Sequence, residues 1–85
     1  MSGVRGEPVE VSERNGRPMR FVWRGRMYTV LFVVDRRLTP AEPESGGLAG
    51  SEYWRVEATP GRLVPPAVYE LCHDVAADRW SVSLG

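Results

Sequence analysis

The sequence predicts an all-β domain, a strongly curved antiparallel meander of five or six strands that forms an SH3-like small barrel or an open half-barrel. Three observations support this fold class. Apolar and polar residues alternate in several short runs, residue pairs that favour tight turns separate the first runs, and proline or glycine interrupts the longer connections. With 85 residues, the chain is expected to form one domain spanning 1–85.

A first hairpin is predicted around Asn15-Gly16. Val9 and Val11 alternate with polar residues before this pair, and Asn-Gly favours the positive φ angles that a two-residue hairpin loop requires. Pro18 then opens the next strand, where its missing N–H is least disruptive. Residues 1–8 are expected to fray.

A second hairpin is predicted around Arg24-Gly25. If these two residues form the loop, Phe21 pairs with Tyr28 and Trp23 pairs with Arg26, whereas a bulge at Gly25 would shift this register. One face of the hairpin is then the predicted core, formed by Met19, Phe21, Trp23, Tyr28, Val30, Phe32 and Val34.

Leu31 and Val33 are apolar residues on the opposite face of this hairpin. A strand that is apolar on both faces is usually covered on both. Either the sheet curls over itself into a small barrel, or a partner packs against this side. Leu31 and Val33, or an open sheet edge, are therefore the candidate site for a protein–protein interaction or for homodimerisation.

The middle of the chain, residues 36–51, is predicted to be a long flexible loop, because it combines two prolines and three glycines with few apolar residues. Alternation resumes in the next strand, which directs Trp54, Val56 and Ala58 towards the core. A last strand is predicted to direct three further residues inwards, namely Trp80, Val82 and Leu84.

Residues 67–77 fit two secondary structures. Their apolar residues follow helical spacing, and Pro66 suits the first position of a helix. The alternative is a strand with Tyr69, Leu71 and His73 on one face. Periodicity alone does not decide between them, but the surrounding strands and short connections favour the strand.

Residue types that perform catalysis or bind metals are scarce. Cys72 is the only cysteine and His73 the only histidine, and neighbours on a strand point to opposite faces, which argues against a nucleophile pair or a metal cluster. We therefore expect a non-enzymatic protein without catalytic residues, metal or cofactor. The single thiol and the lack of a long apolar run indicate a cytoplasmic protein without a membrane partner.

Charge is distributed unevenly along the chain. Residues 1–37 contain eight arginines and four acids, whereas residues 38–85 contain three arginines and seven acids. The two halves either neutralise each other across a sheet or form a basic face for a polyanion. Small barrels bind single-stranded nucleic acid with arginines on phosphates and aromatic rings on bases. On this basis the candidate nucleic-acid-binding residues are Arg20, Arg24, Arg26, Arg36, Arg37 and Arg55.

Several short motifs occur in a characteristic order: Phe21-x-Trp23-Arg24-Gly25-Arg26-x-Tyr28-x-Val30, Tyr53-Trp54-Arg55-Val56-Glu57-Ala58, Tyr69-Glu70-Leu71, Asp74 and Trp80. From Val9 to Leu84 the chain resembles a small actinobacterial domain family of unknown function, which is similar to the C-terminal segment of some Y-family, translesion-type DNA polymerase proteins. It differs in residues 36–51, where many relatives are rich in tryptophan. The resemblance implies an all-β domain, supports the strand at Tyr69-Glu70-Leu71 and implies a link to DNA repair.

Together these features predict an accessory or binding module. Its expected partner is DNA or a DNA-polymerase-type protein, bound through the arginine face. The alternative is a protein-interaction or homodimerisation module that uses the side of Leu31 and Val33 or a sheet edge. The oligomeric state does not follow from the sequence.

Overall fold

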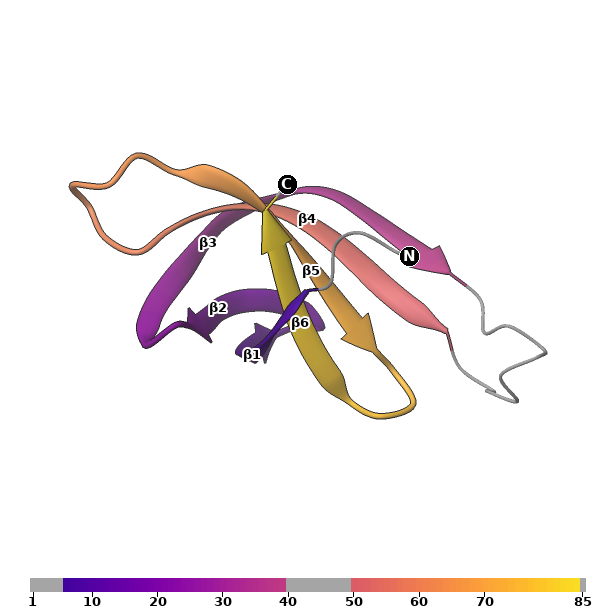
Figure 1. The fold of residues 1–85 in the computed structure, drawn as a ribbon. Helices are drawn as coiled ribbons and strands as arrows, with labels where there is room; N and C mark the ends of the chain where they lie inside the picture. Colours follow the sequence, from indigo (N-terminus) through magenta and orange to yellow (C-terminus); the bar gives the residue numbers. More distant parts are fainter. Residues whose placement is uncertain (1–5, 40–49, 85) are drawn as a thin grey trace.

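The computed structural model describes residues 6–39 and 50–84 (Figure 1). Within these ranges the chain contains no helix and forms six β-strands, which are β1 (Glu7–Arg14), β2 (Arg17–Trp23), β3 (Arg26–Thr39), β4 (Ser51–Thr59), β5 (Ala67–Asp74) and β6 (Arg79–Leu84). Each strand pairs antiparallel with the next, and β1 pairs with β6. The predicted all-β meander is therefore confirmed, and it closes into a barrel.

Both predicted hairpin turns are present. Asn15 and Gly16 have φ angles of 54° and 76°, and Arg24 and Gly25 have φ angles of 54° and 77°. Positive φ at both central positions gives a turn whose twist matches that of the flanking strands. Phe21 pairs with Tyr28 and Trp23 with Arg26, as predicted, so no bulge interrupts the second hairpin at Gly25.

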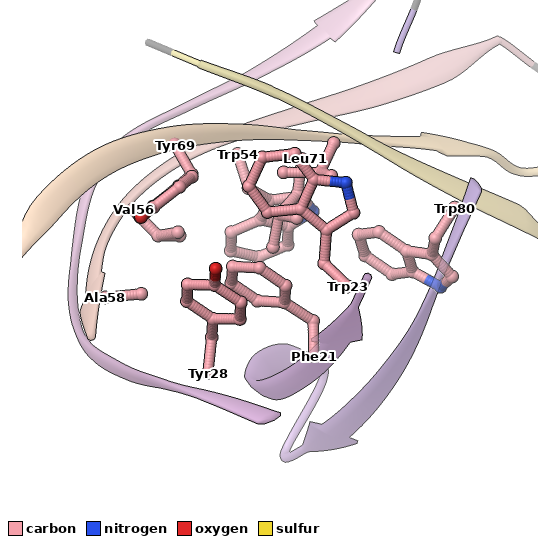
Figure 2. Packing of buried hydrophobic residues seen from close by; sticks show 10 residues of the cluster. Phe21, Trp23, Tyr28, Trp54, Val56, Ala58, Tyr69, Leu71 and Trp80 are labelled. Atoms are coloured by element: carbon pink, nitrogen blue, oxygen red, sulfur yellow. The ribbon is translucent and has the colours of Figure 1, made fainter. Parts of the chain in front are cut away.

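The core lies inside the barrel and is dominated by aromatic rings (Figure 2). The rings of Phe21 and Tyr28 are stacked with centroids 4.9 Å apart, and Tyr69 meets both of them edge-on. Such pairs each contribute about 0.5–1.5 kcal/mol beyond the burial of their surface. The completely or largely buried residues are Phe21, Trp23, Tyr28, Trp54, Val56, Ala58, Tyr69, Leu71, Trp80 and Val82.

Two register shifts in β3 change which residues face the core. The shifts fall between Val30 and Phe32 and between Val33 and Asp35. Val33 therefore packs against the core, whereas Phe32 and Val34 are 58% and 50% exposed. The prediction that Phe32 and Val34 are core residues is wrong, because each extra residue in a bulge reverses the alternation of faces.

Three further predictions are corrected, two by the strand boundaries and one by exposure. Glu7 and Pro8, expected to fray, lie in β1. β3 continues to Thr39 and β4 begins at Ser51, so the predicted loop 36–51 is strand at both ends. Residues 40–49 of this loop lie outside the described residues, as do residues 1–5. Leu84, predicted to face the core, is 73% exposed at the end of β6.

The segment that fitted either a helix or a strand is a strand. β5 pairs with β4 from Ala67 to Asp74, and Tyr69 and Leu71 face the core as the strand alternative predicted. A turn at 75–78 then leads into β6.

The barrel is closed by short ladders on both sides of the β1–β2 hairpin. β2 pairs with β3 only between Arg20–Trp23 and Arg26–Thr29. β1 pairs with β6 only at Glu7, Pro8 and Val9. The tip of this hairpin, at Asn15-Gly16, consequently lies apart from both neighbouring strands. In Figure 1, β3 and β4 run side by side as a long ribbon.

Candidate functional site

The edge of β3 that faces β2 is paired only at the start of the strand. Beyond Thr29 this edge has no strand partner within the described residues, because the ladder with β2 ends there. On its other edge β3 stays paired with β4 as far as Thr39. An unpaired edge of this length presents a row of backbone N–H and C=O groups that a further strand can bind.

Apolar side chains are concentrated along the same strand. Of the ten large apolar side chains that are exposed in the described part of the chain, five belong to β3, and these are Met27, Leu31, Phe32, Val34 and Leu38. Leu38, near the end of the strand, is 65% exposed. Single exposed apolar residues are ordinary. Four of these five, all except Met27, lie in the part of β3 whose second edge is unpaired among the described residues, and such a row is typical of an interaction site.

A groove of about 270 Å³ lies where β2 and β3 separate. One wall comes from the tip of the β1–β2 hairpin and carries Arg14 and Arg17. The other wall comes from β3 and carries Leu31, Phe32 and Val33. The groove thus combines a basic wall, an apolar wall and an unpaired strand edge.

The two residues predicted for protein interaction have different positions. Leu31 is exposed and lines both this groove and a second hollow of about 440 Å³ beside the β4–β5 connection. Val33 lines the groove but also packs against the core. The sequence does not reveal Phe32, Val34 and Leu38 as surface residues of this site, because alternation predicts the first two in the core and composition predicts the third in a loop.

Four of the six candidate arginines form ion pairs on the barrel surface. Arg24 lies 2.6 Å from Glu7, Arg36 lies 3.0 Å from Glu52, and Glu70 lies 3.5 Å from Arg37 and 3.7 Å from Arg55. Arg36 and Arg37 belong to the basic half of the sequence, and their partners belong to the acidic half. At this place the two halves neutralise each other across the sheet.

The other two candidate arginines, Arg20 and Arg26, form no ion pair within the described residues. Arg20 lies near the Met27 sulfur, with Nη1 3.9 Å from Sδ. Arg14 and Arg17, which were not among the candidates, face each other as a cross-strand pair at the hairpin tip. Their positions on either side of Asn15-Gly16 would have been the signal to include them.

The Glu7 carboxylate connects the ends of β1 and β2. It accepts hydrogen bonds from Arg24, with Nε 3.0 Å from Oε1 and Nη2 2.6 Å from Oε2, and from the Trp23 indole at 2.7 Å. These bonds, of which the one from Arg24 has the largest effect, lower the pKa of Glu7 to about 2.

A second polar cluster surrounds His73 on β5. Its Nδ1 lies 3.3 Å from Glu52 and its Nε2 lies 2.9 Å from Asp78, while its ring stacks on Trp80 with centroids 4.2 Å apart. Burial alone would lower the pKa of His73, but the hydrogen bonds to Asp78 and Glu52 raise it above its ordinary value. Nearby, the buried indole N–H of Trp54 forms no hydrogen bond to any described residue.

Cys72 and the acidic side chains are the other groups whose chemistry bears on the site. The thiol of Cys72 has its pKa raised, mainly by burial, which makes it a poor nucleophile. Among the residues that the structure describes, no three His, Cys, Asp or Glu side chains are grouped closely enough to hold a metal ion. A third groove, of about 840 Å³, lies between β1 and β6 and is lined by several acidic side chains and by Trp80.

Comparison with known proteins identifies the family. Residues 1–83 match the family model described as a domain of unknown function, DUF6504. The chain belongs to this family. No curated protein and no solved structure matches it. The match confirms membership of a domain family of unknown function, whereas an actinobacterial origin and a relation to polymerases remain expectations.

In this DUF6504 domain, the unpaired edge of β3 and the groove beside it form the candidate functional site.

None of the elements described in residues 6–39 and 50–84 is a helix of the length and hydrophobicity that crossing a membrane requires.

Proposed function

We propose that this domain is a non-enzymatic protein-interaction module that binds an extended segment of another protein as an additional strand on β3. The observation that carries the proposal is the edge of β3, which lacks a strand partner among the described residues and bears exposed apolar side chains. A polymerase-type protein is a partner that the family resemblance suggests.

Strand addition suits this edge for two physical reasons. Main-chain hydrogen bonds to the edge supply affinity, and alternate side chains of the added strand enter pockets that supply specificity. Leu31 and Phe32 line the groove at the start of the edge, and Leu38 lies exposed further along β3. An added strand would cover all three.

A displayed library of random eight-residue peptides tests the proposal. Peptides selected on the domain should lose binding to the double variant Phe32→Lys, Val34→Lys, because lysine on a strand edge opposes further pairing. Leu63→Lys is the matched control, since Leu63 is 97% exposed and lies in the β4–β5 connection. The control should bind like the unaltered domain.

Hydrogen exchange gives an independent measurement on the same peptides. Backbone amides between Val30 and Leu38 should exchange more slowly in the complex, whereas amides of β5 should not change. Peptide binding without protection in β3 would contradict strand addition. A concentration-dependent dimer in sedimentation, with the same pattern of protection, would assign the edge to homodimerisation instead.

Nucleic-acid binding is the second candidate function, and it would agree with a role in DNA repair. The observation in its favour is that Arg14, Arg17 and Arg20 lie on one hairpin and form no ion pair with a described carboxylate. Exposed ion pairs contribute only about 0–1 kcal/mol to protein stability. Phosphates could therefore compete with the carboxylate partners of Arg36 and Arg37.

Titration with single- and double-stranded DNA at two salt concentrations tests this second function. Binding should shift the backbone resonances of residues 14–37 and should weaken at the higher salt concentration, because phosphate binding releases counterions. If no resonance in this range moves even at low salt, DNA is not a partner of the domain.

A further inference from the structure

The basic wall of the groove is formed by two like charges that face each other. Arg14 and Arg17 are cross-strand partners at the end of the β1–β2 hairpin, and both are exposed. Like charges directly opposite each other on a sheet are destabilising. A carboxylate supplied from outside would relieve this repulsion, and none of the described acids forms an ion pair with either arginine.

The opposite wall requires a different kind of group. Leu31, Phe32 and Val33 line it, and Met19 lines the groove as well. Apolar side chains of a partner would be favourably buried against this wall, because both surfaces would be removed from water. One occupant must therefore offer apolar side chains to β3 and carboxylates to the hairpin tip.

We infer that the partner segment is acidic and apolar, with aspartate or glutamate alternating with apolar residues along an extended strand. Alternation directs successive side chains to opposite faces of a strand, so one segment can satisfy both walls. This inference rests on the proposed strand addition to β3.

A second copy of this chain fits the groove less well. The edge it would offer, Phe32–Leu38, contains one acid, Asp35, and two arginines. Asp35 is therefore its only carboxylate for the hairpin tip, and Arg36 and Arg37 already form ion pairs with carboxylates of β4 and β5. The charges therefore favour a different protein as the partner.

The peptide library also tests the inference when selected peptides are scored for net charge. Peptides selected on the unaltered domain should be net negative with alternating apolar residues. The double variant Arg14→Glu, Arg17→Glu should bind these peptides about tenfold more weakly, as expected when two exposed ion pairs become two repulsive pairs. Selection on this variant should enrich net positive peptides.

Arg62→Glu is the matched control. Arg62 is exposed in the connection between β4 and β5 and does not line this groove. The control should retain the affinity of the unaltered domain for acidic peptides, and both variants should keep its circular dichroism spectrum, since all three arginines are exposed.

The two proposals fail in distinguishable ways. Peptides that protect β3 from hydrogen exchange but are neutral or basic would overturn the acidic preference and leave strand addition intact. Peptides that bind without protecting β3 would overturn both.

Discussion

Single residues stabilise the barrel through contacts between strands that are distant in the sequence. Glu7 connects β1 to the end of β2 through Arg24 and Trp23. His73 connects β4 to the β5–β6 turn through Glu52 and Asp78. Such partners depend on how distant strands are aligned, so the sequence patterns did not indicate these contacts.

Replacement of Glu7 by glutamine should lower the thermal stability of the domain at neutral pH. It should also make this stability less dependent on pH in the acidic range. The pKa of Glu7 is lowered to about 2 in the folded state, so the carboxylate stabilises the fold above its unfolded pKa, about 4.3. This stability is lost as the pH falls through the folded value. Melting temperatures of the two proteins should therefore converge between about pH 4.3 and pH 2.

Glu10→Gln is the control for this measurement. Glu10 is exposed on the same strand and forms no ion pair with a described residue, so its melting curve should follow that of the unaltered domain. A constant difference between the unaltered domain and Glu7→Gln across the whole range would show that Glu7 acts without its charge.

His73 should titrate above the ordinary histidine value of about 6.5. Its folded pKa is raised, so the stability that it contributes is fully present below the unfolded pKa and is lost as the pH rises through the folded pKa. His73→Phe can keep the ring stacked on Trp80 but removes the charge. The stability difference between the two proteins should therefore be larger at pH 5 than at pH 9.

Because His73 is the only histidine, its ring resonances report the titration directly. Asp78→Asn should lower the observed pKa, since the bond to Asp78 is the largest of the effects that raise it. An unchanged pKa in that variant would mean that the bond at Nε2 does not form in solution.

At the scale of strands and turns, the sequence predicts features that depend on neighbouring residues, but not features that depend on the pairing of distant strands. Two-residue turns at Asn15-Gly16 and Arg24-Gly25 were predictable because their chemistry lies within the turn itself. The bulges of β3 were not, since a bulge is defined only against its partner β4. For that reason the sequence does not predict the exposed apolar edge, although Leu31, one of the predicted interaction residues, lies on it.

Gly25→Ala should destabilise the domain by about 1–2 kcal/mol, because an L-residue with a side chain is unfavourable at a φ angle of +77°. No atom lies within 4 Å of the added Cβ, so the loss of stability would come from the backbone conformation and not from a steric clash with other residues. Gly61→Ala, with equally open surroundings and without a positive φ, should change the stability by less than about 0.5 kcal/mol. Denaturant unfolding of both variants provides the comparison, and equal effects would contradict it.

At the scale of the whole molecule, the domain depends on one small core. The barrel class and the core residues of β4 followed from alternation, which is a property of the chain. No local pattern predicts that β1 pairs with β6, or that the tip of the β1–β2 hairpin is separate from its neighbouring strands. Both features arise from where the ladders end.

Leu71→Ala should destabilise the domain by about 2–5 kcal/mol, because Leu71 is completely buried in the core. A core of this size leaves little stability in reserve, so the variant should be largely unfolded at room temperature. Leu63→Ala, at an exposed position, is the control. Circular dichroism in buffer and denaturant unfolding measure both effects, and a loss below about 1 kcal/mol at Leu71 would show that the core repacks.

The seam between β1 and β6 has a consequence for how the domain folds. It joins the two ends of the described chain through three residue pairs, Glu7 with Val82, Pro8 with Ser81 and Val9 with Trp80, whereas all other ladders join strands that follow each other. Contacts between distant residues carry the largest loop-closure entropy. The meander can therefore assemble hairpin by hairpin, with the seam forming last and opening first when the barrel unfolds.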